Sequence, residues 1–311
     1  MIIDMHTHLF PKGAMTEKTW IHYAKVIGSA LGIPPEVIMQ SPMVKEMVNA
    51  TPEILIRDMD QAGIDKSVVF TVDWGLALED FKVSIEDANK YVANAVSQYP
   101  DRLIGFVAVD PRRGEKAVKL LEQGVKEWGM KGLKLHPTAG YYPSDMSVMK
   151  GLYDKAMELG VPIMTHTGFI FGPLLAKFTQ PIHLDDVGAK YPDLKIIAAH
   201  LGNPWTEELL TLCQRRPAIY TDISSTAQTM LTYNPLKFIQ DLRVAMNMFP
   251  KKVMFGSDWP LLKPAMDNKT LVTKMQHLAI PPFMKESGYQ NFTAGDKDQI
   301  MFKNAKTLLK I

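Results

Sequence analysis

The first ten residues carry the pattern with the clearest chemical meaning. His6 and His8 are separated by one residue in an apolar segment that starts at Met1. If this segment is a β-strand, its side chains alternate between two faces, so Asp4 and both imidazoles point to the same side. Two neutral imidazoles on one face can bind a single metal ion. A short His-x-His motif also arises by chance, so its interpretation depends on where the other histidines fall.

The other candidate ligands stand at the ends of short apolar segments. His136, His166 and His200 each close such a segment, and Asp222 and Asp258 close two more. An ordinary structural explanation exists, because a buried strand must change to a polar turn at its end. Histidine is uncommon in proteins, however, so its repeated occurrence at segment ends favours a shared site.

Helical patterns alternate with these apolar segments and must position the candidate ligands. Eight strand-like segments are expected, at residues 1–10, 67–72, 103–109, 131–136, 161–166, 195–200, 218–222 and 252–258. Helical patterns lie between them, for example at 78–99 and 114–128. Buried parallel strands joined by helices predict an α/β fold, and eight such units predict a (β/α)8 barrel of the TIM type, in which all strands end on one face. An open doubly wound sheet is the alternative, but the chain lacks the G-x-G-x-x-G turn typical of that fold.

Residues 11–50 interrupt the regular alternation. They are rich in proline and glycine and contain two short helical patterns, at 17–31 and 35–48. We expect an irregular helical insertion over the barrel mouth, and four residues in or next to it are predicted to reach the substrate. They are Phe10, Trp20, His22 and Tyr23. A loop whose aromatic residues fill a small core of their own is the alternative. A helical extension with a closing helix at 301–309 completes one predicted barrel domain over 1–311.

The composition limits the class of partner. The chain has 311 residues and a net charge of +2, which argues against nucleic acid as the main partner. No apolar stretch approaches the roughly 18 residues of a membrane-spanning helix, and no signal-peptide pattern precedes the first strand. A small-molecule substrate is therefore expected. The single cysteine, Cys213, cannot form an internal disulfide, which suits a reducing cytoplasm.

Four motifs together resemble the amidohydrolase superfamily in their order and spacing. They are His6-Thr-His8, Met164-Thr-His166, Ala198-Ala-His200-Leu-Gly202 and Phe255-Gly-Ser-Asp258-Trp-Pro260. The chain looks most similar to the branch that includes aminocarboxymuconate-semialdehyde decarboxylase, γ-resorcylate decarboxylase and several lactone hydrolases. The resemblance implies a distorted barrel with one divalent metal, held by His6, His8, His166 and Asp258, with His200 at the acid/base position. It is also compatible with a homodimer, which no residue of the sequence indicates.

Three imidazoles and one carboxylate suit Zn²⁺ best, with Mn²⁺, Fe²⁺ and Co²⁺ as alternatives. Because such a metal lowers the pKa of bound water from about 15.7 to about 7, we expect a hydrolase of a small carbonyl compound, such as a lactone, a cyclic amide or a carboxylic acid derivative. His200 would relay the proton, and Asp258 would also hold the water. The alternative is a non-oxidative decarboxylase of a hydroxyaryl or unsaturated dicarboxylic acid. A barrel that only binds its ligand is a remote third hypothesis.

Two features leave further alternatives open. Thr167 and Gly168 follow the fifth-strand histidine, where several decarboxylases of this branch carry proline, so the decarboxylase reading is slightly weakened. Lys134 shares a strand face with His136 and could become a carboxylated lysine that bridges two metals, as in binuclear members, although an ion pair with an inner-barrel acid is simpler. The remaining predicted substrate contacts lie at or just beyond strand ends, and packing explains them nearly as well. They are Trp74, His136, Phe169, Asp222 and Trp259.

Overall fold

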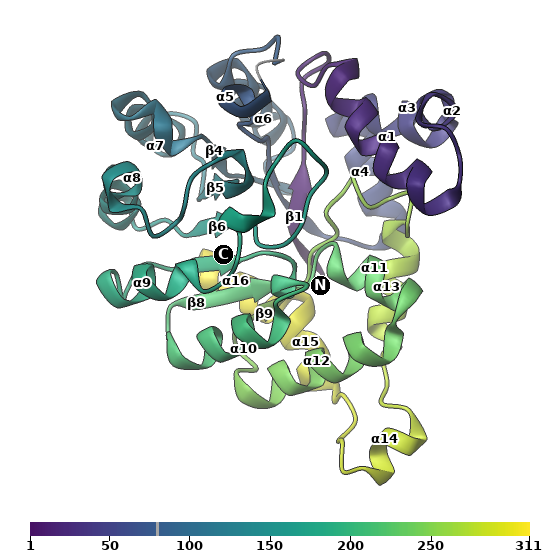
Figure 1. Cartoon of the computed structure of the whole chain (residues 1–311). Coiled ribbons are helices and arrows are strands. Elements are labelled where there is room, and N and C mark those ends of the chain that lie inside the picture. Colours follow the sequence, from purple (N-terminus) through teal and green to yellow (C-terminus); the bar gives the residue numbers. More distant parts are fainter. Residues whose placement is uncertain (79–80) are drawn as a thin grey trace.

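A ring of parallel strands forms the centre of the molecule, with helices around it (Figure 1). The computed structural model describes residues 1–78 and 81–311. The strands are β1 (Ile3–His8), β2 (Lys66–Phe70), β3 (Leu103–Gly105), β4 (Val107–Ala108), β5 (Leu133–Leu135), β6 (Ile163–Thr165), β7 (Ile196–Ala198), β8 (Ile219–Asp222) and β9 (Val253–Met254). They pair in the orders β1-β2-β3 and β4 to β9. Only Phe106 separates β3 from β4, so these are two halves of one barrel strand.

Backbone hydrogen bonds join the last strand to the first. The N–H of Met5 donates to the carbonyl of Phe255 (2.9 Å), and the N–H of Asp258 donates to the carbonyl of His6 (2.8 Å). The segment after β9 therefore continues beside β1, although its backbone is too irregular to count as strand. The predicted (β/α)8 TIM-type barrel is confirmed, with most strands shorter than expected at both ends.

Helices cover the outside of the barrel. Those that follow β2 to β8 are α5 (Gly75–Leu78), α6 (Ile85–Gln98), α7 (Glu115–Lys126), α8 (Met146–Leu159), α9 (His183–Lys190), α10 (Thr206–Arg215), α11 (Thr226–Tyr233) and α12 (Pro235–Met248). The helix expected over 78–99 starts only at Ile85, and residues 79–80 of that expectation lie outside the described residues. The sequence patterns did not predict α11, which begins directly after the polar residues that follow β8.

The insertion after β1 is helical, as predicted. It contains α1 (Glu17–Leu31), α2 (Pro35–Gln40) and α3 (Pro42–Val48), and α4 (Pro52–Ala62) leads to β2. The second predicted pattern is two helices because Pro42 starts a new one, with the Ser41 side chain accepting the N–H of Val44 (3.3 Å). The insertion both fills a small core of its own and contacts the barrel mouth, where the Tyr23 hydroxyl donates to the carbonyl of Leu261 (2.5 Å).

The C-terminal extension packs against the barrel strands. Its helices are α13 (Asn268–Gln276), α14 (Pro282–Glu286), α15 (Ala294–Asp298) and α16 (Asn304–Leu309). The predicted closing helix at 301–309 is α16, preceded by a wider π-helical turn at Gln299–Lys303. Leu308 of α16 belongs to an apolar cluster with Ile3, Phe70 and Met254 of the barrel. Among the described helices, none is long and apolar enough to cross a membrane.

Candidate metal centre and active site

Three predicted metal ligands meet at the carboxyl end of β1. Nε2 of His8 lies 3.1 Å from Oδ1 of Asp258, and Nε2 of His6 lies 3.5 Å from the same oxygen. In a tetrahedral site with bonds of about 2.0–2.1 Å, neighbouring ligand atoms lie roughly 3.4 Å apart. His6, His8 and Asp258 are therefore spaced as ligands of one ion would be, and each offers an atom within 4.8 Å of the other two.

The close approach of the chain after β9 to β1 builds this group. A Cβ at Gly256 would lie 3.1 Å from Cβ of His6 and 2.9 Å from Cβ of Ser224, so a larger residue there would push the segment away. Oδ1 of Asp4 accepts the N–H of Ser257 (3.0 Å) and ties the same segment to β1. Asp258 itself adopts a positive φ of 54°, an uncommon backbone conformation that aims its carboxylate at the imidazoles.

A buried carboxylate determines which nitrogen of His6 carries the proton. Nδ1 of His6 lies 3.0 Å from Oδ2 of Asp222, which can only accept, so Nδ1 carries the proton and Nε2 keeps its lone pair. Burial, with the charge of Lys134, lowers the pKa of His6 well below its ordinary value, so the ring is neutral, as a metal ligand requires. Asp222 also accepts the N–H of His200 (3.2 Å) and of Ser224 (2.9 Å). Although it was predicted to contact substrate, Asp222 is fully buried beneath the cavity and orients other residues.

His200 and His166 form a second linked pair of imidazoles. Nδ1 of His200 lies 3.0 Å from the carbonyl and 2.9 Å from the hydroxyl oxygen of Ser224. Because this hydroxyl donates to Oδ1 of Asp222, Nδ1 of His200 donates to Ser224, and Nε2 of His200 accepts from Nδ1 of His166 at 3.0 Å. Nε2 of His166 then keeps a lone pair, and this buried atom has no partner in the described structure. Burial lowers the pKa of His166 well below its ordinary value. An orphaned, neutral ring nitrogen is what a metal ion would satisfy.

The position of His166 differs from that of the other predicted ligands. Two groups of three ligating side chains lie within 4.8 Å of one another in the described structure: His6, His8 and Asp258, and His6, His200 and Asp222. His166 belongs to neither, and its ring stacks on that of His136 with centroids 4.2 Å apart. Its role as the fourth ligand therefore stays a prediction.

Charge is concentrated in the buried layer beneath the cavity. Burial alone would raise the pKa of Asp258, but the hydrogen bond from His8 and the neighbouring imidazoles lower it far below its usual value, so Asp258 is an anion. Burial lowers the pKa of Lys134 to about 8. Nζ of Lys134 lies 3.0 Å from Nε2 of His6 and 4.6 Å from the centre of the Phe70 ring. Within the described residues Lys134 forms no ion pair, contrary to the simpler of the two expectations for it.

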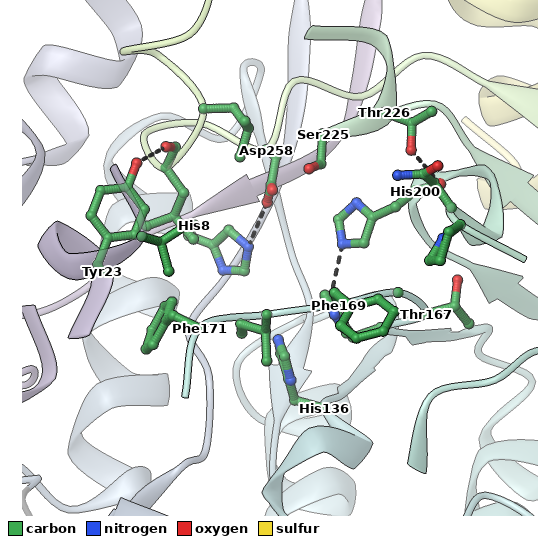
Figure 2. A pocket seen from close by; sticks show the side chains of 18 of the residues that line it. His8, Tyr23, His136, Thr167, Phe169, Phe171, His200, Ser225, Thr226 and Asp258 are labelled. Carbon is green, nitrogen blue, oxygen red and sulfur yellow. Dashed lines mark hydrogen bonds and ion pairs between the residues drawn. The ribbon is translucent and has the colours of Figure 1, made fainter. Parts of the chain in front are cut away.

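A cavity of about 410 Å³ opens above this layer (Figure 2). The side chains around it are His8, Tyr23, Val26, Trp74, His136, His166, Thr167, Phe169, Ile170, Phe171, His200, Asn203, Pro204, Ser225, Thr226, Asp258, Leu261 and Leu262, together with Gly168. Of the predicted substrate contacts, Trp74, His136 and Phe169 line the cavity, as does Tyr23 of the insertion.

Four other predicted contacts do not reach the cavity. Phe10 and Trp20 are buried in the main apolar core, where α1 packs on the barrel. The indole N–H of Trp259 points away from the cavity and donates to Oδ2 of Asp58 (3.0 Å). These aromatic residues serve packing, which was the alternative explanation for them. His22 of α1 is half-buried and also lies outside the cavity lining.

Asn203 and Ser225 also line the cavity but were not predicted to do so. Their only signal in the sequence was their place three residues after the strand-end residues His200 and Asp222.

Comparisons with known proteins agree with this architecture. The sequence profile of the Amidohydrolase family matches residues 3–311. The chain is 20% identical over 173 residues to a 2-amino-3-carboxymuconate-6-semialdehyde decarboxylase of Dictyostelium discoideum, covering 53% of this chain and 48% of that protein. It is 23% identical over 249 residues to a gamma-resorcylate decarboxylase of Polaromonas sp., covering 66% of this chain and 76% of that protein. The match thus spans about half the length of the first relative.

Solved structures show the same fold at low sequence identity. A 5-carboxyvanillate decarboxylase of Novosphingobium aromaticivorans, with bound manganese, aligns with a TM-score of 0.71 at 19% identity and covers 100% of this chain and 97% of that one. An uncharacterized TIM-barrel protein of Bordetella bronchiseptica aligns with a TM-score of 0.68 at 22% identity, covering 99% and 98%. Since the family profile spans nearly the whole sequence, this chain belongs to the Amidohydrolase family.

Proposed function

We propose that this protein is a metal-dependent, non-oxidative decarboxylase of a hydroxyaryl carboxylic acid. The observation that carries the proposal is a cavity with metal-ligating groups and His200 at its base and flat aromatic side chains around it. A planar acid suits this combination, because its ring would pack on aromatic faces while its carboxylate would reach the metal-ligating groups at the bottom of the cavity. Two curated relatives are named as decarboxylases, and one solved neighbour holds 2,6-dihydroxybenzoate. These names favour decarboxylation over the hydrolysis that the sequence analysis preferred.

The donor atoms present fit a divalent metal. His6, His8 and Asp258 would hold it, with the orphaned Nε2 of His166 as the proposed fourth donor. When bound, the metal supplies a Lewis acid that binds oxygen atoms of the substrate and stabilises negative charge. Zn²⁺ and Mn²⁺ both suit imidazole and carboxylate ligands. Solved neighbours with bound manganese support Mn²⁺ as strongly as the donor types support Zn²⁺.

His200 is the proposed proton carrier. In the reaction the bond between the ring carbon and the carboxyl carbon breaks, its electron pair stays on the ring carbon, and a proton takes the place of CO₂. His200 lines the cavity beside the proposed metal ligands, and the Ser224 carbonyl anchors its Nδ1. With Nδ1 anchored, a proton taken up at Nε2 of His200 would be the one passed to the ring carbon.

Product analysis tests this proposal. Purified protein loaded with Mn²⁺ or Zn²⁺ is incubated with 2,6-dihydroxybenzoate and, separately, with a panel of lactones. We expect release of CO₂ and no opening of the lactones. Opening of a lactone without CO₂ release would contradict decarboxylation and support the hydrolase instead. His183 of α9 does not line the cavity and provides a control variant, His183→Ala, whose products should match those of the native chain.

A further inference from the structure

We infer that the substrate carries a single carboxylate and turns an apolar ring edge toward the insertion. The inference rests on the proposed function, which directs the carboxylate to the metal-ligating base of the cavity. The two sides of the cavity differ in chemistry. Figure 2 shows Tyr23 and Phe171 on one side and His200, Thr167 and Thr226 on the other, with His8 and Asp258 between them.

The side next to the insertion offers no free hydrogen-bonding group. It consists of Tyr23 and Val26 of α1, Phe171, and Leu261 and Leu262 after β9; we call these five residues the apolar wall. The only polar atom among their side chains is the Tyr23 hydroxyl, which already donates to the carbonyl of Leu261 (2.5 Å). The ring of Tyr23 meets that of Phe171 edge to face, with centroids 6.1 Å apart. A substrate edge on this wall gains from apolar contact and finds no partner for a charge.

The opposite side retains unused polar groups. The side chains of Asn203 and Ser225 line the cavity and form no hydrogen bond within the described structure. Both belong to the loops that present His200 and follow Asp222. A hydroxyl group next to the substrate carboxylate would find its partners here. The cavity therefore orients a ring with its hydroxyl edge toward Asn203 and Ser225 and its other edge toward the apolar wall.

A second carboxylate would find no cation. Every lysine and arginine of the chain lies in the described part, and none of them lines the cavity. Lys263, which follows the apolar wall, is paired with Asp58 (2.8 Å) and Glu46 (2.6 Å). Lys134 is fully buried beneath His6. Burying an unpaired carboxylate against apolar side chains is costly, so dicarboxylates should be rejected.

A series of matched ligands tests the inference by binding. The ligands are 2-hydroxybenzoates with hydrogen, methyl or carboxylate at ring position 4 or 5, titrated calorimetrically into the Mn²⁺-loaded protein. We expect the methyl compounds to bind at least as tightly as the parent, and both dicarboxylates to bind at least about tenfold more weakly. A dicarboxylate that binds as tightly as its methyl counterpart would overturn the inference.

A gain-of-function variant sharpens the same test. Val26 lies on the apolar wall and is 56% exposed, so an arginine fits there without being forced into the core. Val26→Arg should restore most of the lost dicarboxylate affinity, whereas the uncharged control Val26→Gln should not. An unchanged preference in Val26→Arg contradicts the inference. CO₂ release is measured separately: if no ligand loses CO₂ but the ranking holds, the proposed reaction fails and the inference about the ligand stands.

Discussion

The base and the apolar wall of the cavity are built in opposite ways. The base contains fully buried polar residues from several strands, such as His6 of β1 and Asp222 of β8, and hydrogen bonds fix each of them. The apolar wall comes from α1 and from loops, and one side-chain hydrogen bond, from Tyr23 to Leu261, joins its two parts. From this difference we infer that the barrel strands position the reactive groups while the attached segments would select the substrate. Substitutions at the base of the cavity should therefore change metal content and turnover, and substitutions in the apolar wall should change substrate affinity.

The largest effect is expected from loss of a ligand in the base. His8→Ala removes a donor next to Asp258, so metal content should collapse and turnover should disappear while the fold persists. His166→Ala should do the same if its orphaned nitrogen is the fourth donor. Metal analysis and circular dichroism measure both variants. Full metal content in His166→Ala would remove it from the ligand set, and a native chain that refuses Zn²⁺ and Mn²⁺ would favour a ligand-binding barrel over an enzyme.

A substitution of His200 should distinguish the loss of the chemical step from the loss of metal binding at the base of the cavity. His200→Gln should keep its metal and lose turnover by about 10²- to 10⁴-fold, the range typical of a general acid or base. Metal content and CO₂ release are measured on the same preparation. Turnover equal to that of the native chain would refute the proton-carrier role.

Asp222 should have a smaller effect because it acts through His6. Asp222→Asn replaces the acceptor of the His6 Nδ1 proton with a neutral amide, which weakens control of the ring. We expect metal affinity to fall about 10- to 100-fold. Competition with a chelator measures this change, with Asp185→Asn on the exposed surface of α9 as the matched control. An affinity within twofold of the native value contradicts the assigned role.

Tyr23 tests the wall. Tyr23→Phe keeps the ring but removes the hydrogen bond to Leu261, so unfolding free energy should fall by about 0.5–1.5 kcal/mol. KM should rise more than kcat falls, because the wall is proposed to contact the substrate away from the reacting carbon. Denaturant unfolding and steady-state kinetics measure the two effects. A loss of kcat as large as that of His200→Gln would erase the distinction between base and wall.

The smallest effect is expected at Asp58, which pairs with Lys263 next to the apolar wall and contributes to the stability of the fold in a pH-dependent way. Burial acts to raise the pKa of Asp58, but hydrogen bonds from Lys263, Trp259 and Arg57 outweigh burial and lower the pKa. A carboxylate with a lowered pKa contributes stability above its unfolded pKa of about 3.9, and this contribution is lost as the pH falls through the lower, folded value. The native chain should therefore exceed Asp58→Asn in stability near pH 6, and the difference should shrink below about pH 4. An equal difference at both pH values contradicts this account.

Local patterns predicted the elements better than the contacts. The predicted helix at 17–31 is α1 with the same ends, because proline, glycine and amphipathic spacing act within a few residues. The same patterns could not distinguish Trp20 from Tyr23, which lie three positions apart on α1. One is buried in the core and the other lines the cavity, since the packing of α1 on the barrel decides which part of its surface faces the site.

By itself, the sequence determined the order of the strands along the chain, several of the helix ends and the residue types at the strand ends, because these depend on local propensity and side-chain periodicity. Only the tertiary structure decided that Asp222 contacts His6, that His166 lies outside both groups of three ligating side chains, and that no lysine or arginine lines the cavity. These features depend on how far each strand bends as it leaves the barrel and on which loop packs over which. Distances across the barrel mouth are set by contacts between residues that are remote in the chain.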